Sequence, residues 1–242
     1  KYTSLRDAYA SIVKALEHCE VACGADVETR WIDTTDLIDA NAVEAMRDLD
    51  GVIVPGGFGV RGTEGKVACI RYAREKCLPY LGICLGFQMA VIEYARNVCG
   101  LAGANSTELQ PDCEEPVIDI LPDQKQIEGL GGNMRLGGQD IEIQPGSLAA
   151  ELFEGATHVR MRFRHRYEVD PRYVERLEQE GLHFSGKHPT QPIMQILELP
   201  RERHPYFVGT QAHPCLTSRP LRPQPLFVGL VQAAMNYARA RA

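Results

Sequence analysis

Apolar residues near the start of the chain recur with the spacing of an α-helix. They lie three and four residues apart from Leu5 to Leu16, which predicts an amphipathic helix. The same kind of pattern predicts further helices over residues 41–48, 64–76, 85–98, 171–180 and 227–240. Short apolar runs bounded by turn residues predict strands over residues 27–32, 51–55, 79–83, 140–143, 158–163, 193–198 and 207–211.

Strands that alternate with helices in this way predict the α/β class. We expect one domain over residues 1–242, with a doubly wound, mostly parallel central sheet that is flanked by helices. The short segments in the second half predict a small antiparallel β extension. In such sheets ligands gather at the carboxyl ends of the strands, so the turns after residues 54 and 83 point to one crevice.

Residues 111–138 interrupt the alternation. This stretch is rich in glycine, proline and acidic residues, and so many glycines cannot supply a packed core. Loops of this length are often active-site lids. We therefore expect a mobile loop that covers the crevice.

Composition narrows the class of protein. Hydrophobic residues make up 44% and charged residues 24% of the chain, as in ordinary globular proteins. A net charge of −6 gives no electrostatic reason to bind nucleic acid or a membrane, and no apolar run approaches the roughly 20 residues of a membrane span. Eight cysteines fall mostly within predicted elements and show no paired metal-ligand spacing, so we expect a reducing, cytoplasmic setting and no metal.

Cys84 lies at the sharpest predicted turn, inside Gly82-Ile-Cys-Leu-Gly86. The pattern is that of a nucleophile elbow, a strand that turns abruptly into a helix and carries the nucleophile at its tip. A cysteine at a helix N-terminus is favoured as thiolate by the helix dipole. A buried structural cysteine is an equal alternative on these residues alone.

A nucleophilic cysteine needs a base, and His213 is the best placed of the seven histidines. It follows the apolar run 206–210, which puts it at the end of a strand, and Pro214 stiffens its backbone. His165 lies in a strongly basic run, which disfavours a base that must gain a proton. His204 precedes a proline in a charged turn, where we expect a solvated side chain.

Several short motifs follow one another in a fixed order: Pro-Gly-Gly-Phe-Gly, Gly-Ile-Cys-Leu-Gly-Phe-Gln, Ala-Asn-Ser-Thr-Glu, Asn-Met-Arg-Leu-Gly, His-Arg-Tyr-Glu-Val and Gln-Ala-His-Pro. In this series the chain resembles the triad-type (class I) glutamine amidotransferases. Within them it is similar to the glutaminase domains of CTP synthases over essentially its whole length. The elbow and the His-Pro element are shared across the superfamily. The run Arg61-Gly-Thr-Glu-Gly65, the Asn-Met-Arg-Leu-Gly motif and the His-Arg-Tyr-Glu-Val motif are typical of CTP synthases.

The resemblance implies a role for each matching residue. Cys84 would attack the carboxamide of L-glutamine and form a γ-glutamyl thioester with loss of ammonia, and His213 would relay protons. The backbone N–H groups of Gly57 and Leu85 would form the oxyanion hole. The residues implied to bind glutamine are Gly57, Phe58, Leu85, Gly86, Phe87, Gln88, Glu108, Arg166 and Tyr167.

The family also implies partners. The ammonia would pass to an N-terminal synthetase domain of a longer polypeptide that assembles as a homotetramer, where ATP and Mg²⁺ drive the amination of UTP to CTP. No Walker-type loop occurs in the 242 residues, so we expect that domain to lie outside this chain and expect no cofactor within it. GTP would activate the enzyme through the region of Arg61, Gly62, Glu64 and Arg135.

Cys215 departs from the family pattern. The family carries a glutamate after His-Pro, which orients the histidine, and a neutral thiol cannot stabilise an imidazolium as a carboxylate does. A catalytically impaired regulatory or assembly domain is therefore the alternative to an active glutaminase. A third reading is another cysteine hydrolase, such as a γ-glutamyl peptidase, which the glutamine-binding motifs disfavour.

Overall fold

A computed structural model describes residues 1–121 and 134–241 of the chain. Its helices are α1 (Ala10–Cys23), α2 (Asp39–Met46), α3 (Thr63–Glu75), α4 (Leu85–Asn97), α6 (Leu148–Leu152), α7 (Pro171–Gln179) and α8 (Pro225–Arg241), with 3₁₀ turns η1 (Arg6–Tyr9) and η2 (Pro214–Thr217). Its strands are β1 (Val52–Val54), β2 (Tyr80–Ile83), β3 (Ala104–Ser106), β4 (Glu115–Asp119), β5 (Arg135–Ile143), β6 (His158–His165), β7 (Glu168–Val169), β8 (His183–Lys187), β9 (Met194–Glu198) and β10 (Phe207–Thr210).

In the described part of the chain, a seven-stranded sheet runs in the order β1-β2-β10-β9-β8-β5-β6. The strands β1, β2 and β10 pair in parallel. The sheet then continues in antiparallel pairing through β9, β8, β5 and β6, so its antiparallel part is larger than the expected extension. A second sheet, β3-β4-β7, lies beside α4.

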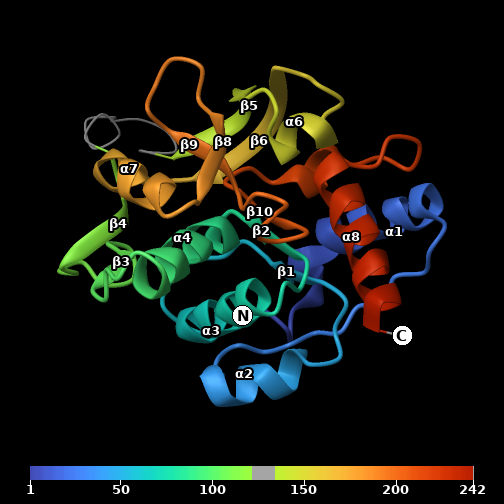
Figure 1. Ribbon diagram of the computed structural model, residues 1–242, viewed down its shortest axis with the longest axis horizontal. Coiled ribbons are helices and arrows are strands. Elements are labelled where there is room, and N and C mark those ends of the chain that lie inside the picture. Colours follow the sequence, from blue (N-terminus) through green and yellow to red (C-terminus); the bar gives the residue numbers. More distant parts are fainter. Residues whose placement is uncertain (122–133, 242) are drawn as a thin grey trace.

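Helices cover both faces of the parallel strands, as the α/β class requires. Figure 1 shows α2, α3 and α4 on one side and α1 and α8 on the other. Alternate strand residues enter the two cores: Tyr80 and Phe207 pack with α3 and α4, whereas Leu81 and Val208 pack with α1 and α8. This alternation follows from the two-residue period of a strand, and it confirms the expected α/β architecture.

The strand predicted over residues 27–32 is wrong. These residues carry no regular secondary structure, and the Val27 N–H donates to the Glu20 side chain at 3.0 Å. Val27 and Ile32 line a cavity of about 620 Å³ together with Val52 and Val54 of β1. A strand needs a neighbour that accepts its backbone hydrogen bonds, and the cavity separates this segment from β1.

The loop predicted over residues 111–138 is wrong at both ends. Strand β4 forms within it because β3 and β7 pair with it. Strand β5 includes Gly137 and Gly138, which pair with Phe163 and Arg162 of β6, because a backbone ladder needs no side chain on the glycines. The middle of the expected lid, residues 122–133, lies outside the described residues. The sequence also fails to predict β8, since His183–Lys187 shows no apolar run.

None of the helices in the described ranges is long and apolar enough to cross a bilayer.

Candidate active site

The carboxyl ends of β1, β2 and β10 bring three chain segments together. Val54 pairs with Gly82, and Ile83 pairs with Thr210, so the three strands end at one level. Gly56 and Gly57 follow β1, Cys84 follows β2, and His213 follows β10 by three residues. The predicted nucleophile and the predicted base therefore lie together at the carboxyl ends of these strands.

Cys84 forms the predicted elbow between β2 and α4. Its backbone has φ 52° and ψ −102°, which is a strained conformation for a residue with a side chain. Neighbouring glycines permit the turn: a Cβ on Gly86 would overlap the Val54 carbonyl oxygen, and one on Gly82 would lie 2.9 Å from the Gly86 carbonyl carbon. The Tyr80 hydroxyl donates to the Gly86 carbonyl at 2.9 Å and holds the elbow from below.

Cys84 and His213 flank Gly56. A Cβ built on Gly56 would lie 3.4 Å from the Cys84 Cβ and 3.1 Å from the His213 Cε1, so both side chains border one point above this glycine. Only glycine leaves that space open. Both residues are buried, with 7% and 5% of their surface exposed. The His213 Nε2 atom has no hydrogen-bond partner within the described residues.

Burial sets the charge state of this pair. It raises the pKa of the Cys84 thiol to about 12, against partial lowering by a hydrogen bond from the Leu85 N–H and by Arg164. Burial, with Arg164 and His165 nearby, lowers the pKa of His213 to about 3. Both groups are therefore neutral at pH 7 in the free site. A neutral imidazole can accept the thiol proton when Cys84 attacks a substrate.

A backbone N–H group lies beside the Cys84 thiol. Leu85 begins α4, and its N–H already points at the Cys84 sulfur. A Cβ on Gly57 would lie 3.4 Å from the Leu85 side chain, so Gly57 and Leu85 are neighbours. First-turn N–H groups at the positive end of a helix suit a developing oxyanion.

Gln88 joins α4 to the segment after β6. Its Nε2 donates to the Tyr167 carbonyl at 2.9 Å and to the Gln211 Oε1 at 3.1 Å. Glu108, after β3, accepts a hydrogen bond from the Gly59 N–H at 2.9 Å. The structure thus connects Gln88 to Tyr167, and Glu108 to the glycine-rich turn after β1.

The remaining residues expected to bind glutamine differ in exposure. Phe58 is exposed, with 72% of its surface accessible, and Arg166 is also exposed. Phe87 is fully buried in the core, so only its backbone can reach the site. The Gly86 carbonyl is occupied by Tyr80.

Cys215 lies two residues after His213, in η2. Its thiol accepts a hydrogen bond from the Ser11 hydroxyl at 3.4 Å. Burial raises its pKa, although Ser11, Arg164 and nearby backbone N–H groups oppose the rise. The thiol therefore stays neutral at pH 7, and no carboxylate stands at this position.

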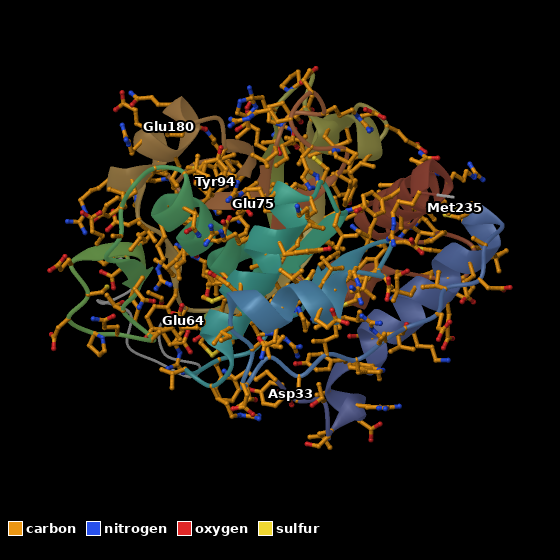
Figure 2. All side chains as sticks on the ribbon, turned by 60° about the horizontal axis from the view of Figure 1, so that its bottom comes forward. Asp33, Glu64, Glu75, Tyr94, Glu180 and Met235 are labelled. Atoms are coloured by element: carbon orange, nitrogen blue, oxygen red, sulfur yellow. The ribbon has the colours of Figure 1, made fainter. Side chains whose placement is uncertain are left out.

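The residues expected to respond to GTP contact different parts of the fold. Arg61 donates to the Lys1 carbonyl, and Gly62 is the left-handed N-cap of α3 (φ 71°). Glu64, labelled in Figure 2, pairs with Arg96 at 2.8 Å. Arg135, in contrast, pairs with buried Glu168 on β7.

The solvated side chain predicted for His204 is wrong. It is 1% exposed, because the turn before β10 folds it against α3, where its Nε2 donates to the Ala73 carbonyl at 3.0 Å. Sequence reasoning also missed Gly56, Gln211 and Ser11. For Gly56 the doubled glycine after β1 was the available signal, whereas the other two act through contacts between distant segments.

Comparison with known proteins identifies the family of this chain. The family model "Glutamine amidotransferase class-I" matches residues 4–233. The chain belongs to the class-I glutamine amidotransferases. It is 51% identical over 242 residues to a CTP synthase of Thermus thermophilus and 52% identical over 239 residues to CTP synthase of Archaeoglobus fulgidus. These alignments cover 98% and 99% of this chain but 44% of each relative, so the chain spans less than half the length of these relatives.

A solved structure narrows the match within the family. The glutaminase domain of Trypanosoma brucei CTPS with bound acivicin superposes with a TM-score of 0.90 at 34% identity. The match covers 98% of this chain and 91% of the trypanosomal one. The amidotransferase is therefore a glutaminase domain of the CTP synthase kind. A GMP synthase subunit of Thermoplasma acidophilum, at 15% identity and a TM-score of 0.57, shares the fold.

Proposed function

We propose that this amidotransferase domain hydrolyses L-glutamine to glutamate and ammonia at Cys84. The observation that carries the proposal is the placement of a strained cysteine and a neutral histidine on either side of Gly56. The family identity supplies the substrate class, and the buried site limits side reactions with water.

The reaction begins when the neutral His213 takes the Cys84 thiol proton as the sulfur attacks the carboxamide carbon. The N–H groups of Leu85 and Gly57 hold the resulting oxyanion. His213 then gives the proton to the leaving nitrogen, the C–N bond breaks, and ammonia departs from a γ-glutamyl thioester. In the second half His213 takes a proton from water as the hydroxide attacks the thioester carbon. The C–S bond breaks, the sulfur takes the proton back from His213, and glutamate leaves the free thiol.

Charged groups around the crevice fit the two ends of an amino acid. Glu108 supplies a carboxylate for the α-ammonium group, and Arg166 supplies a guanidinium for the α-carboxylate. Gln88, through its bond to the Tyr167 carbonyl, fixes the backbone beside Arg166. The remaining contacts would come from the backbone of Gly57, Phe58 and residues 85–87.

The longer relatives suggest the use of the ammonia. We propose that it passes to a synthetase domain of the same polypeptide, which aminates UTP to CTP with ATP and Mg²⁺. GTP activation through the region of Arg61, Gly62 and Glu64 and assembly into a homotetramer belong to the same proposal. The cationic Arg61 is engaged by Lys1 and Tyr2 in this structure, so a nucleotide would compete with these contacts.

A catalytically impaired domain is the second candidate, because Cys215 stands where the family carries a carboxylate. Acivicin, the amino acid electrophile bound in the trypanosomal structure, separates the two. We expect the parent protein to gain one covalent adduct at Cys84, located by intact mass and peptide mapping, and to release ammonia from glutamine.

The matched control is Cys84→Ser. It is expected to form no adduct, and its glutaminase turnover is expected to fall by at least about a thousandfold. Cys69→Ser, in the core of α3 and away from the crevice, is expected to keep both. An adduct without ammonia release would favour the impaired domain. No adduct at Cys84 would contradict the proposed nucleophile.

A further inference from the structure

A buried carboxylate on β7, that of Glu168, contacts the first residue of β5 and the last residue of β6. Glu168 Oε1 lies 2.6 Å from the Arg135 Nε and 2.8 Å from the His165 Nε2. The Glu168 side chain is fully buried, and those of Arg135 and His165 are 16% and 3% exposed. The His165 Nε2 and the Glu168 Oε1 are within hydrogen-bond distance of each other.

These three residues enclose a short connection. Arg135 is the first residue of β5 and is the cross-strand partner of His165, the last residue of β6. Glu168 is the first residue of β7, which pairs with β4. Only residues 166 and 167 separate His165 from Glu168. The contact between these two side chains therefore joins the two ends of the connection.

The enclosed connection carries two of the residues proposed to bind glutamine. Arg166 and Tyr167 are the residues proposed to hold the glutamine carboxylate, and the Tyr167 carbonyl accepts from Gln88 on α4 at 2.9 Å. The connection is therefore held from β5, from β7 and from α4. Packing and hydrogen bonds of this kind hold a binding group within a fraction of an ångström of the geometry that binds the substrate.

We propose that Arg135, Glu168 and His165 form a clamp that positions Arg166 and Tyr167 for the α-carboxylate of glutamine, with Glu168 as the central positioning residue. The inference rests on the proposed glutaminase function. It gives Arg135 a role in substrate binding through Glu168, distinct from direct contact with a nucleotide. The clamp does not touch the reacting atoms.

Two reagents for Cys84 test the clamp. Acivicin carries the α-amino and α-carboxylate groups that the clamp would serve, whereas iodoacetamide carries neither. For Glu168→Gln we expect the second-order rate constant of acivicin labelling to fall roughly ten- to hundredfold while iodoacetamide labelling stays within about twofold. Arg135→Met should change the rates in the same direction, and Arg135→Lys should recover part of the loss.

The matched control is Asp140→Asn. Asp140 and Arg160 are also cross-strand partners on β5 and β6 and pair at 2.9 Å, but both are more than half exposed. This variant should leave both rates unchanged, because exposed pairs contribute little. Steady-state kinetics should show that Glu168→Gln raises KM for glutamine more than it lowers kcat.

Any outcome other than a selective loss of acivicin labelling contradicts the clamp. Equal slowing with both reagents would assign the three residues to general folding or to thiol reactivity, and unchanged acivicin labelling would remove any role in substrate binding. If Glu168→Gln does not fold, Arg135→Met decides, since Arg135 lies at the edge of the cluster. A parent protein that reacts with iodoacetamide but not with acivicin would instead contradict the proposed function.

Discussion

The family resemblance implies a glutamate at position 215, where this chain carries a neutral thiol. Burial raises the Cys215 pKa, so the residue brings no negative charge to stabilise a protonated His213. The Ser11 hydroxyl and nearby backbone N–H groups already donate toward this position. A carboxylate placed there would find its hydrogen-bond donors in place.

Cys215→Glu is therefore expected to raise glutaminase turnover by at least about tenfold, because the carboxylate would orient His213 and stabilise its protonated form. The rate of ammonia release at saturating glutamine measures the effect. Cys215→Gln, which has the same shape without the charge, should remain near the parent rate. A glutamate variant no faster than the glutamine variant would show that the thiol is no handicap.

At the scale of elements, the elbow depends on how closely α4 packs on β1. A Cβ on Gly86 would overlap the Val54 carbonyl oxygen and would lie 2.9 Å from its carbonyl carbon. Both atoms belong to the strand backbone, so they cannot rotate away as a side chain would. The helix must therefore move, and Cys84 with it.

Gly86→Ala is expected to destabilise the protein by roughly 3 kcal/mol through this overpacking and to reduce acivicin labelling of Cys84. Urea unfolding monitored by circular dichroism measures the first effect. Gly138→Ala is the control, because its Cβ would meet the flexible Arg160 side chain at 3.1 Å. If the two substitutions lower the free energy of unfolding by the same amount, close packing of the elbow is not the cause of the destabilisation.

Elements with their own periodicity could be predicted from the sequence, and those that depend on neighbours could not. The elbow, the helix after it and the strand before His213 follow from local apolar patterns and glycines. Residues 27–32 have a strand-like pattern but no neighbour to pair with, and β8 has neighbours without a pattern. Likewise Cys84 and His213 could be found from their motifs, whereas the position of Gly56 between them depends on three strands ending together.

At the scale of the whole molecule, the neutral form of His204 links the turn before β10 to α3. Its Nε2 donates to the Ala73 carbonyl of α3 at 3.0 Å, and its Nδ1 accepts from the Tyr206 N–H at 3.2 Å. A protonated imidazole has no acceptor nitrogen, so protonation would break the second bond. Burial accordingly lowers the His204 pKa to about 4.

The stability of the whole protein is therefore expected to fall as the pH drops from about 6.5 to about 4. In this range the unfolded chain binds a proton at His204 and the folded protein does not, so lowering the pH favours unfolding by up to about 1.4 kcal/mol per pH unit for this histidine. Urea unfolding between about pH 7 and about pH 4.5 measures the slope of the unfolding free energy against pH.

The control is His204→Gln, which can still donate to the Ala73 carbonyl but cannot titrate. Its unfolding free energy should change less steeply with pH by the contribution of His204, whatever its stability at pH 7. The loss that remains should come partly from His213, whose pKa is lowered to about 3. Equal slopes in parent and variant would show that His204 takes up its proton over the same pH range in the folded and the unfolded chain, and its neutral link between α3 and the turn before β10 would be contradicted.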